Sequence, residues 1–337
     1  MCILDFYCHR CVHLYNLQQR MISNIVCAVN DSLYYQMLCK GLVLSLFKYS
    51  QLSHPNITIL LDGSNVEPLN DLLLQQSSLN IQKIQPLNII CGSVESRTTF
   101  ARLEIPYLTA TKHFDRVLYL DVDTYCMNNI EELFTIEFDT VAMVVPGKDL
   151  HIKKFMKQQF NKNLRPLRYR LESSREDFIV GAIDHKYSNA GVMLIDVEKF
   201  REKKVKEHVE VLVKTYPDDM LTSDEMALNL LFRGQITELP QEFNTFSFNC
   251  QYINTPRIWH FNIKKPIIHT SLNNFPIWLN LFNNKDTTVL RALSFVFNCF
   301  GKNRVLAIKS DAYDLLGETR SENNLKQIVN KLLVDKQ

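Results

Sequence analysis

The sequence lacks an excess of charge of either sign: 38 lysine and arginine residues stand against 36 aspartate and glutamate residues, a net charge of +2. So close a balance argues against a nucleic-acid partner, because no broad electrostatic field would attract a polyanion. No apolar run is as long as a membrane span. His9, Arg10 and His13 interrupt the only apolar stretch near the start, so we expect no signal peptide. These absences predict a cytoplasmic protein that is at most peripheral to a membrane.

The cysteines do not form a pattern that predicts disulfide bonds. There are nine, scattered singly apart from Cys8 and Cys11. An odd, dispersed set is typical of buried thiols in a reducing compartment. Cys8 and Cys11 have the spacing of a zinc-binding pair, but no second Cys or His pair stands nearby at the required spacing. A zinc site there is therefore disfavoured.

The most informative feature that is present is a strand-like run, residues 116–123, that ends on two carboxylates, Asp121 and Asp123. Side chains alternate along an extended chain, so the two aspartates point the same way while Val122 points inward. Two carboxylates on one side of a strand end can bind a divalent cation. Such a cation has coordination positions left for a diphosphate. This strand end is therefore a candidate site for a sugar nucleotide.

Strand-like and helix-like patterns alternate along most of the chain. The predicted strands span residues 22–30, 57–61, 81–84, 117–120, 141–145 and 187–196. The predicted helices span residues 34–49, 69–76, 98–111, 200–216 and 224–232. The alternation predicts an α/β fold in which a mixed, mostly parallel sheet carries helices on both faces. Ligands in such folds bind beyond the carboxyl ends of the strands, where the two aspartates stand.

The remaining segments set the expected domain boundaries. A polar, basic stretch at 147–177 has little apolar periodicity and predicts a long loop, either mobile or functional. We expect an extension at 1–20, a catalytic domain at 21–282 and a helical region at 283–337. In that last region, the apolar helix at 287–300 either packs on the domain or lies on an anionic membrane surface. A polar amphipathic helix is predicted at 321–336.

Six segments in sequence order carry a resemblance to a known family. They are 25–31 (IVCAVND), 99–106 (TFARLEIP), 117–123 (VLYLDVD), 187–196 (YSNAGVMLID), 223–229 (SDEMALN) and 239–244 (LPQEFN). Together they resemble the retaining glycosyltransferases of family 8, the group that contains glycogenin and bacterial lipopolysaccharide galactosyl- and glucosyltransferases. The resemblance covers roughly residues 22–280. It implies a GT-A fold, a UDP-sugar donor and a divalent metal.

In the family, a histidine near the C-terminal end completes the metal site beside the two aspartates. This sequence offers two candidates. His269 precedes Pro276 and Trp278, which is similar to the family's His-x6-Pro-Trp pattern, with Phe275 in place of the usual lysine. His260 lies in IWHFNIKKP, which also resembles the motif but lacks the tryptophan, so we favour His269. A nitrogen ligand beside oxygen ligands favours Mn2+ over Mg2+.

The resemblance also implies how the donor is bound. Asn30, with Ala28 before it, would hydrogen-bond the uracil edge, and Tyr34 would stack on the base, one position after the family's usual aromatic. Arg102 would reach the diphosphate or a donor hydroxyl with its planar guanidinium. The small residues that follow Asn189 would let the backbone approach the donor sugar. The predicted donor-binding set is Ala28, Asn30, Asp31, Tyr34, Arg102, Asp121, Val122, Asp123, Ala190 and Gly191.

The resemblance implies three catalytic residues: Asn189, Asp224 and Glu225. Asp224 would bind hydroxyl groups of the donor sugar, just after a Thr222-Ser223 pair that predicts a helix cap. Glu225 stands where the family usually has glutamine, near the anomeric carbon. It would act as a covalent nucleophile, or it would stabilise positive charge while the departing phosphate activates the acceptor. We favour the second route.

The predicted activity is metal-dependent transfer of glucose or galactose from a UDP-sugar to a hydroxyl acceptor. The acceptor is a glycan, a lipid-linked sugar such as lipopolysaccharide core, or a protein. Two alternatives remain: a nucleotidyltransferase, or a degenerate family member that binds sugar nucleotides without catalysis. The first requires a glycine-rich phosphate loop after the opening strand, and residues 30–36 contain no glycine. Glu225 and the missing lysine before Pro276 mildly favour the second, whereas the intact aspartates disfavour it.

Overall fold

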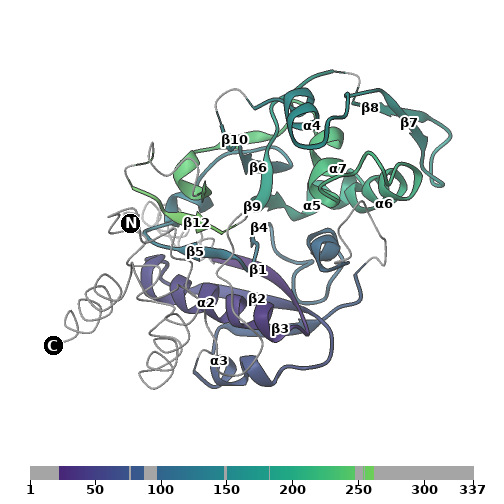
Figure 1. Cartoon of the computed structure of the whole chain (residues 1–337). Helices are drawn as coiled ribbons and strands as arrows, with labels where there is room; N and C mark the ends of the chain where they lie inside the picture. Colours follow the sequence, from purple (N-terminus) through teal and green to yellow (C-terminus); the bar gives the residue numbers. More distant parts are fainter. Residues whose placement is uncertain are drawn as a thin grey trace, which may run out of the picture.

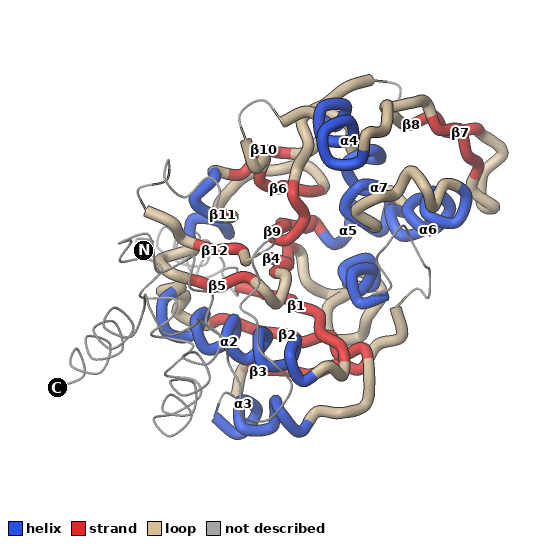
Figure 2. Tube along the Cα trace, viewed as in Figure 1, coloured by secondary structure: helices blue, strands red, loops and turns tan. Residues whose placement is uncertain are grey.

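The computed structural model describes residues 23–75, 77–86, 97–147, 150–181, 183–246, 253 and 255–261. The predicted extension at 1–20, His269 and the predicted helices at 287–300 and 321–336 lie outside these residues. Within the described part, a central sheet is flanked by helices on both sides (Figures 1 and 2). No helix among the described residues combines the length and apolarity needed to cross a bilayer.

The central sheet of the described part has seven strands in the order β10-β6-β9-β4-β1-β2-β3. Their bounds are β1 Ser23–Asn30, β2 Pro55–Asp62, β3 Leu79–Lys83, β4 Arg116–Leu120, β6 Val141–Val144, β9 Asn189–Asp196 and β10 Thr237–Leu239. The pairs β1–β2, β2–β3, β1–β4 and β6–β10 are parallel. Strand β9 runs antiparallel to both of its neighbours, β4 and β6. The predicted mixed, mostly parallel sheet is therefore confirmed.

Two smaller sheets complete the strand content of the described residues. One joins β11 (Thr245–Phe246), β12 (Ile258–His260) and β5 (Thr124–Cys126), with β12 antiparallel to β5. The other is the hairpin of β7 (Leu167–Arg170) and β8 (Asp177–Val180). Because β5 follows β4 after a three-residue turn, the first small sheet lies at the carboxyl end of β4.

Helices cover both faces of the central sheet, as predicted. The α-helices are α2 (Leu33–Tyr49), α3 (Asn70–Gln75), α4 (Ile152–Phe160), α5 (Val197–Glu202), α6 (Val205–Thr215) and α7 (Asp224–Leu231). The 3-10 helices are η1 (Glu67–Leu69), η2 (Arg97–Glu104), η3 (Glu131–Phe134) and η4 (Gln241–Phe243). In Figure 1, α2 lies over β1 and β2, whereas α5, α6 and α7 lie beyond β9.

Alternation along β1 shows how the sheet separates two cores. Ile25, Cys27 and Val29 pack with α2, while Val26 and Ala28 pack in the cluster that includes α5, α6 and α7. Successive side chains of a strand point to opposite faces, so a strand covered on both faces reads as a continuous apolar run. Each large aliphatic side chain buried in this way contributes about 1.5–3 kcal/mol.

The prediction of a long loop at 147–177 is wrong, because this segment contains α4 and β7 and ends where β8 begins. Helix α4 buries only Ile152 and Met156, spaced i and i+4, and its C-cap residue, Asn161, has the left-handed conformation. In β7, Leu167 and Tyr169 are buried, while Arg168 and Arg170, which alternate with them, are exposed. Both elements have a narrow apolar face and many basic residues, which concealed their periodicity.

Two further expectations differ from the structure in detail. The predicted helix at 98–111 is the 3-10 helix η2 up to Glu104, followed by turns. Ser223 occupies the N-cap position of α7, but its side chain makes no capping hydrogen bond. Instead, Ser223 has φ +58° and its hydroxyl lies 3.3 Å from that of Thr99. A positive φ at a residue other than glycine is strained, and it sets the direction in which α7 begins.

Candidate functional site

The antiparallel pairing of β9 with β4 builds the centre of the site. The carboxyl end of β4 lies beside the amino end of β9, and Asp121 N–H donates to the carbonyl of Gly191 at 2.8 Å. Just beyond, Thr124 closes a turn: its N–H and its hydroxyl both donate to the carbonyl of Asp121, at 2.9 and 2.7 Å. This turn holds Asp123 at the same strand end.

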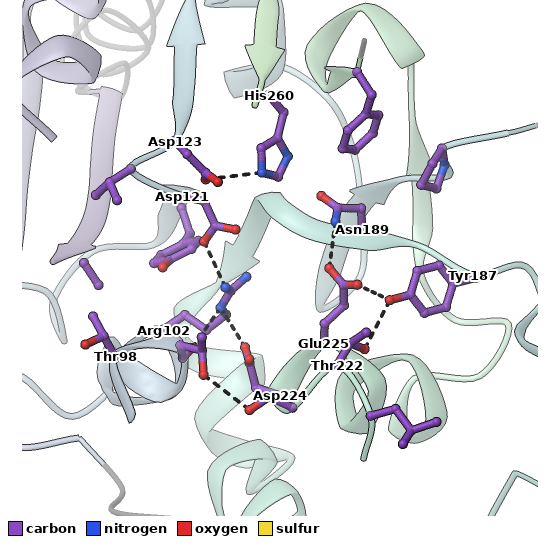
Figure 3. A pocket seen from close by; sticks show the side chains of 18 of the residues that line it. Thr98, Arg102, Asp121, Asp123, Tyr187, Asn189, Thr222, Asp224, Glu225 and His260 are labelled. Carbon is purple, nitrogen blue, oxygen red and sulfur yellow. Dashed lines mark hydrogen bonds and ion pairs between the residues drawn. The ribbon is translucent and has the colours of Figure 1, made fainter. Parts of the chain in front are cut away.

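Three side chains converge there and could hold a metal ion: Asp121, Asp123 and His260, with ligand atoms all within 4.8 Å of one another. His260 Nε2 lies 3.3 Å from Asp123 Oδ1 (Figure 3). The pairing of β12 with β5 sets His260 opposite Thr124, which explains how a residue so distant in sequence reaches the site. The less favoured histidine of the two candidates is thus beside the aspartates, and the favoured His269 lies outside the described residues.

A chain of side-chain amides fixes which nitrogen of His260 carries a proton. The N–H of Gly191 donates to Asn189 Oδ1 at 3.0 Å, and so does Asn244 Nδ2 at 2.8 Å. Asn244 therefore presents its oxygen to His260 Nδ1, 2.9 Å away, and accepts from it. The lone pair of a neutral His260 is then on Nε2, facing the two aspartates. Ring orientation of this kind is what a metal-binding histidine requires.

Space and charge at this centre fit a small cation. A Cβ added at Gly191 would lie 2.2 Å from His260 Cε1 and 2.9 Å from Asp121 Oδ2, so only glycine leaves room here. Burial opposes a positive charge on His260, yet the carboxylates of Asp123 and Asp121 raise its pKa. The same field would attract a divalent cation. Carboxylate oxygens with one imidazole nitrogen are ligands that can hold a divalent metal ion.

Arg102 is buried at the centre of the carboxylate groups. Its Nη2 lies 3.0 Å from Asp121 Oδ1 and its Nε lies 2.8 Å from Asp224 Oδ2. Its Nη1 donates to the carbonyl of Ala190, and the guanidinium lies 4.3 Å from the ring centre of Tyr119. Burial opposes the charge, but the carboxylates of Asp224 and Asp121 raise the pKa of Arg102 overall. Burial raises the pKa of Asp224 to about 7, against the opposing effect of Arg102.

Glu225 is held by three hydrogen-bond donors. The hydroxyl of Tyr187 donates to Oε1, while Asn189 Nδ2 and the N–H of Ala190 donate to Oε2 at 2.8 and 2.9 Å. Burial raises the pKa of Glu225, while the hydrogen bonds from Tyr187 and Ala190 lower it. Figure 3 shows this carboxylate beside Asn189, with the ion pair of Arg102 and Asp224 on the side away from Tyr187.

These residues open into one pocket of about 820 Å³. The predicted site residues that line it are Ala28, Asn30, Arg102, Asp121, Val122, Asp123, Asn189, Asp224, Glu225 and His260. Ala190 and Gly191 are buried in β9 and contribute backbone contacts. Tyr34 belongs to α2, but its side chain is outside the described part of the structure, and Tyr35 lines the pocket.

Asp31 does not line the pocket. Its carboxylate accepts hydrogen bonds from the N–H groups of Ser64 and Asn65, at 2.9 and 2.8 Å. These bonds hold the loop after β2 against the end of β1 and lower the pKa of Asp31. Gly63, with φ +155°, has no room for a Cβ because the carboxylate of Asp31 occupies the space.

Comparison with known proteins identifies the group to which the chain belongs. The model of glycosyl transferase family 8 matches residues 24–270. The chain belongs to glycosyl transferase family 8. The predicted class, a glycosyltransferase, is therefore confirmed at the level of the family.

Individual relatives of this family 8 chain are distant. It is 28% identical over 178 residues to a lipopolysaccharide 1,2-glucosyltransferase of Escherichia coli, covering 52% of this chain and 46% of that protein. It is 22% identical over 249 residues to general stress protein A of Bacillus subtilis, covering 70% of this chain and 78% of that protein. The chain thus spans about half the length of the glucosyltransferase that it matches.

A solved structure confirms the predicted fold. The galactosyltransferase LgtC, in complex with donor and acceptor sugar analogues, has a TM-score of 0.55 to this chain at 20% identity. The match covers 81% of this chain and 95% of LgtC. At this identity the likeness concerns the fold alone, which is the predicted GT-A arrangement.

Several residues of the family 8 site were not assigned a role from the sequence. These residues are Tyr187, Asn229 and Asn244. All three lie in the segments that carry the resemblance, and that position is the feature of the sequence from which a role in the site could have been predicted. Asn229 Oδ1 accepts from the N–H of Ser188 at 2.7 Å, and its Nδ2 donates to the carbonyls of Ser188 and Glu225. These three polar residues position the amino end of β9 and the start of α7.

Proposed function

We propose that this family 8 protein is a metal-dependent, retaining glycosyltransferase that moves a hexose from a UDP-sugar to a hydroxyl group. The hexose would be glucose or galactose, and the acceptor a glycan, a lipid-linked sugar or a protein. The names of two relatives, a lipopolysaccharide 1,2-glucosyltransferase and the galactosyltransferase LgtC, support these substrate classes.

One observation carries the proposal: Asp121, Asp123 and His260 present their ligand atoms to a common point at the wall of the pocket. Asp121 and Asp123 come from the turn between β4 and β5, His260 comes from β12, and Gly191 leaves the space between them clear. Mn2+ bound there would neutralise charge on the departing UDP. Mg2+ would serve less well, because one of the three ligands is a nitrogen.

Other pocket residues would bind different parts of the donor. Asn30, at the carboxyl end of β1, lines the pocket and would hydrogen-bond the uracil. Arg102 brings a fixed, buried positive charge that would stabilise the diphosphate in the transition state. Asp224, oriented by Arg102, would accept hydrogen bonds from hydroxyl groups of the donor sugar.

The contacts of Glu225 favour a role in charge stabilisation over covalent attack. Three donors occupy most of the lone-pair positions of its carboxylate. A nucleophile requires a lone pair directed at the anomeric carbon. A carboxylate held this firmly instead provides a fixed negative charge beside an oxocarbenium-like transition state. The departing phosphate would then remove the proton from the acceptor hydroxyl.

The proposal is tested by incubating the protein with UDP- and GDP-sugars, with and without Mn2+, and measuring release of the free sugar. Hydrolysis of UDP-glucose or UDP-galactose is expected, and it should depend on Mn2+. Asp123→Ala should abolish both the hydrolysis and Mn2+-dependent binding of UDP. The matched control is Asp177→Ala, which removes an exposed aspartate of the β7–β8 hairpin and should change neither.

The outcomes separate the proposal from its two alternatives. Binding of UDP-sugar without turnover in any acceptor mixture would indicate a non-catalytic family member. Release of pyrophosphate from a nucleoside triphosphate would indicate a nucleotidyltransferase. Unchanged binding and turnover in Asp123→Ala would refute the metal site itself.

A further inference from the structure

One part of the pocket is lined without charge. Helix α4 and the segment before it contribute Pro146, Leu150, Phe155, Gln159 and Phe160 to the lining. The charged lining residues come from other elements and are Arg102, Asp121, Asp123, Asp224, Glu225 and His260. The metal and diphosphate would occupy the charged part. The α4 part therefore suits a neutral ligand.

The aromatic rings of this part form a continuous surface. Phe155 stacks on Tyr187 with ring centres 3.8 Å apart and planes at 15°. Phe160 meets Phe155 edge to face, with ring centres 5.7 Å apart. Phe160 is 36% exposed, and it is the one exposed large hydrophobic side chain of the described residues that lines this pocket. An exposed aromatic ring in a binding pocket is typical of a ligand contact.

We infer that Phe155, Gln159 and Phe160 form the binding platform for a neutral pyranose ring of the acceptor. The inference rests on the proposed function and specifies its acceptor class. A pyranose presents C–H groups on its ring faces, which pack against the negative face of an aromatic ring. Its hydroxyl groups lie at the ring edge, where the exposed amide of Gln159 can donate and accept hydrogen bonds.

The platform adjoins the residues at which transfer would take place. Tyr187, on which Phe155 stacks, donates its hydroxyl hydrogen to Glu225 and lies 3.2 Å from the hydroxyl of Thr222. Only one side chain therefore separates Phe155 from the Glu225 carboxylate. A sugar ring seated on the platform would place a hydroxyl beside the donor, which is the geometry that transfer requires.

The lysines of α4 do not make this surface attractive to an anionic sugar. Lys153, Lys154 and Lys157 are exposed, but none lines the pocket. Lys157 instead donates to Asn161 Oδ1 at 2.8 Å, at an exposed position. A phosphorylated or uronic acid ring on the platform would have no cation among the α4 lining residues and would face Glu225. We expect such rings to be rejected.

The test measures binding of simple sugars in the presence of saturating UDP and Mn2+. Saturation-transfer NMR is recorded with methyl β-glucoside, methyl β-galactoside, maltose and lactose, and with methyl β-glucuronide as the charged counterpart. At least one neutral sugar should bind through its ring C–H protons, and the glucuronide should not. Phe160→Ala should weaken that binding about threefold to tenfold, the usual contribution of an aromatic contact, without loss of UDP binding.

Lys157→Ala, on the same helix but outside the pocket, is the matched control and should leave sugar binding unchanged. Phe160→Trp should retain the binding, because it keeps an aromatic face. Equal binding to the wild type and Phe160→Ala overturns the inference, as does tighter binding of the glucuronide than of the neutral sugars. Absence of every neutral sugar while UDP binds overturns it too and leaves the proposed function standing. Loss of UDP binding in the wild type would instead refute the proposed function.

Discussion

At the scale of single residues, the site depends on one position without a side chain. Gly191 lies in β9 between His260 and Asp121, and its N–H begins the amide chain that orients the imidazole. A glycine within a strand normally weakens it, so a close approach of other groups is the physical reason for its presence. Here the groups that approach are the candidate metal ligands themselves.

Replacing Gly191 with alanine is expected to displace His260, because the added Cβ would lie 2.2 Å from its ring. Mn2+ affinity should fall about 10- to 100-fold, the usual cost of disturbing the groups around a metal ligand. Calorimetric titration with Mn2+ in the presence of UDP measures the effect. Gly147→Ala is the matched control, since its Cβ would meet nothing within 4 Å. Equal Mn2+ affinities in the two variants would contradict the proposed position of the ion.

At the scale of elements, the junction of β9 with α7 connects the candidate metal site to Glu225. Asn229 is buried in α7 and bonds both backbone groups of Ser188, the residue just before β9. Its Oδ1 accepts from the N–H of Ser188, and its Nδ2 donates to the carbonyl of Ser188. Its Nδ2 also donates to the carbonyl of Glu225 at 2.9 Å. One amide therefore fixes the register between the strand and the helix.

Asn229→Asp should break this junction while keeping the shape of the side chain. The carboxylate cannot donate, so it would face the carbonyls of Ser188 and Glu225 in a buried position. We expect a loss of about 3 kcal/mol in the free energy of unfolding, measured by urea denaturation. Asn163→Asp makes the same chemical change at an exposed position and should cost less than about 0.5 kcal/mol. Similar losses in both variants would disprove the role of the junction.

The β7–β8 hairpin packs on α6 through a buried histidine. His208 Nδ1 lies 2.7 Å from the hydroxyl of Tyr169, and Phe178 meets the imidazole edge to face. Burial lowers the pKa of His208 from 6.5; Glu207 opposes this to a smaller extent, and Lys204 lowers the pKa further. The unfolded chain then takes up a proton at a higher pH than the folded protein, so stability is lost as the pH falls below about 6.5.

Replacing His208 with asparagine, which can still bond the Tyr169 hydroxyl, should reduce this pH dependence. Between pH 7 and pH 5, the free energy of unfolding should fall less steeply in the variant than in the wild type. Denaturation curves at several pH values measure the slope. His113→Asn, at an exposed position, should keep the slope of the wild type. If the free energy of unfolding of His208→Asn fell more steeply with decreasing pH than that of the wild type, the proposed effect of His208 would be wrong.

At the scale of the whole molecule, local patterns in the sequence were enough for every strand of the central sheet except β10, but not for every contact between distant segments. The run ending at Asp121 and Asp123 predicted both a strand and its ligands, because alternation is a local property. Which histidine lies beside the two aspartates depends on the pairing of β12 with β5, and this pairing brings His260 there. Helix α4 was missed because only Ile152 and Met156 mark its buried face. Its role in lining the pocket depends on packing against Tyr187, which no local pattern records.

The boundary predicted at residue 282 has a consequence for stability. All buried side chains of the two described cores lie between Ile25 and Ile258, and the family match ends at 270. A variant that ends at residue 282 keeps all of these side chains and is therefore expected to unfold cooperatively. It should also keep Mn2+-dependent binding of UDP, because the described pocket lies within it.

The same variant distinguishes the two roles considered for residues 283–337. The apolar segment 289–300 has Arg291 within it and Lys302 and Arg304 after it, a composition that can bind an anionic membrane surface. If that role holds, the full chain should co-sediment with phosphatidylglycerol vesicles, less so at high salt, and the shortened variant should not. If the segment instead packs on the domain, removing it exposes apolar surface, so the urea midpoint falls and vesicle binding is absent from both proteins. A membrane role is therefore supported only when the shortened variant loses vesicle binding and keeps its stability.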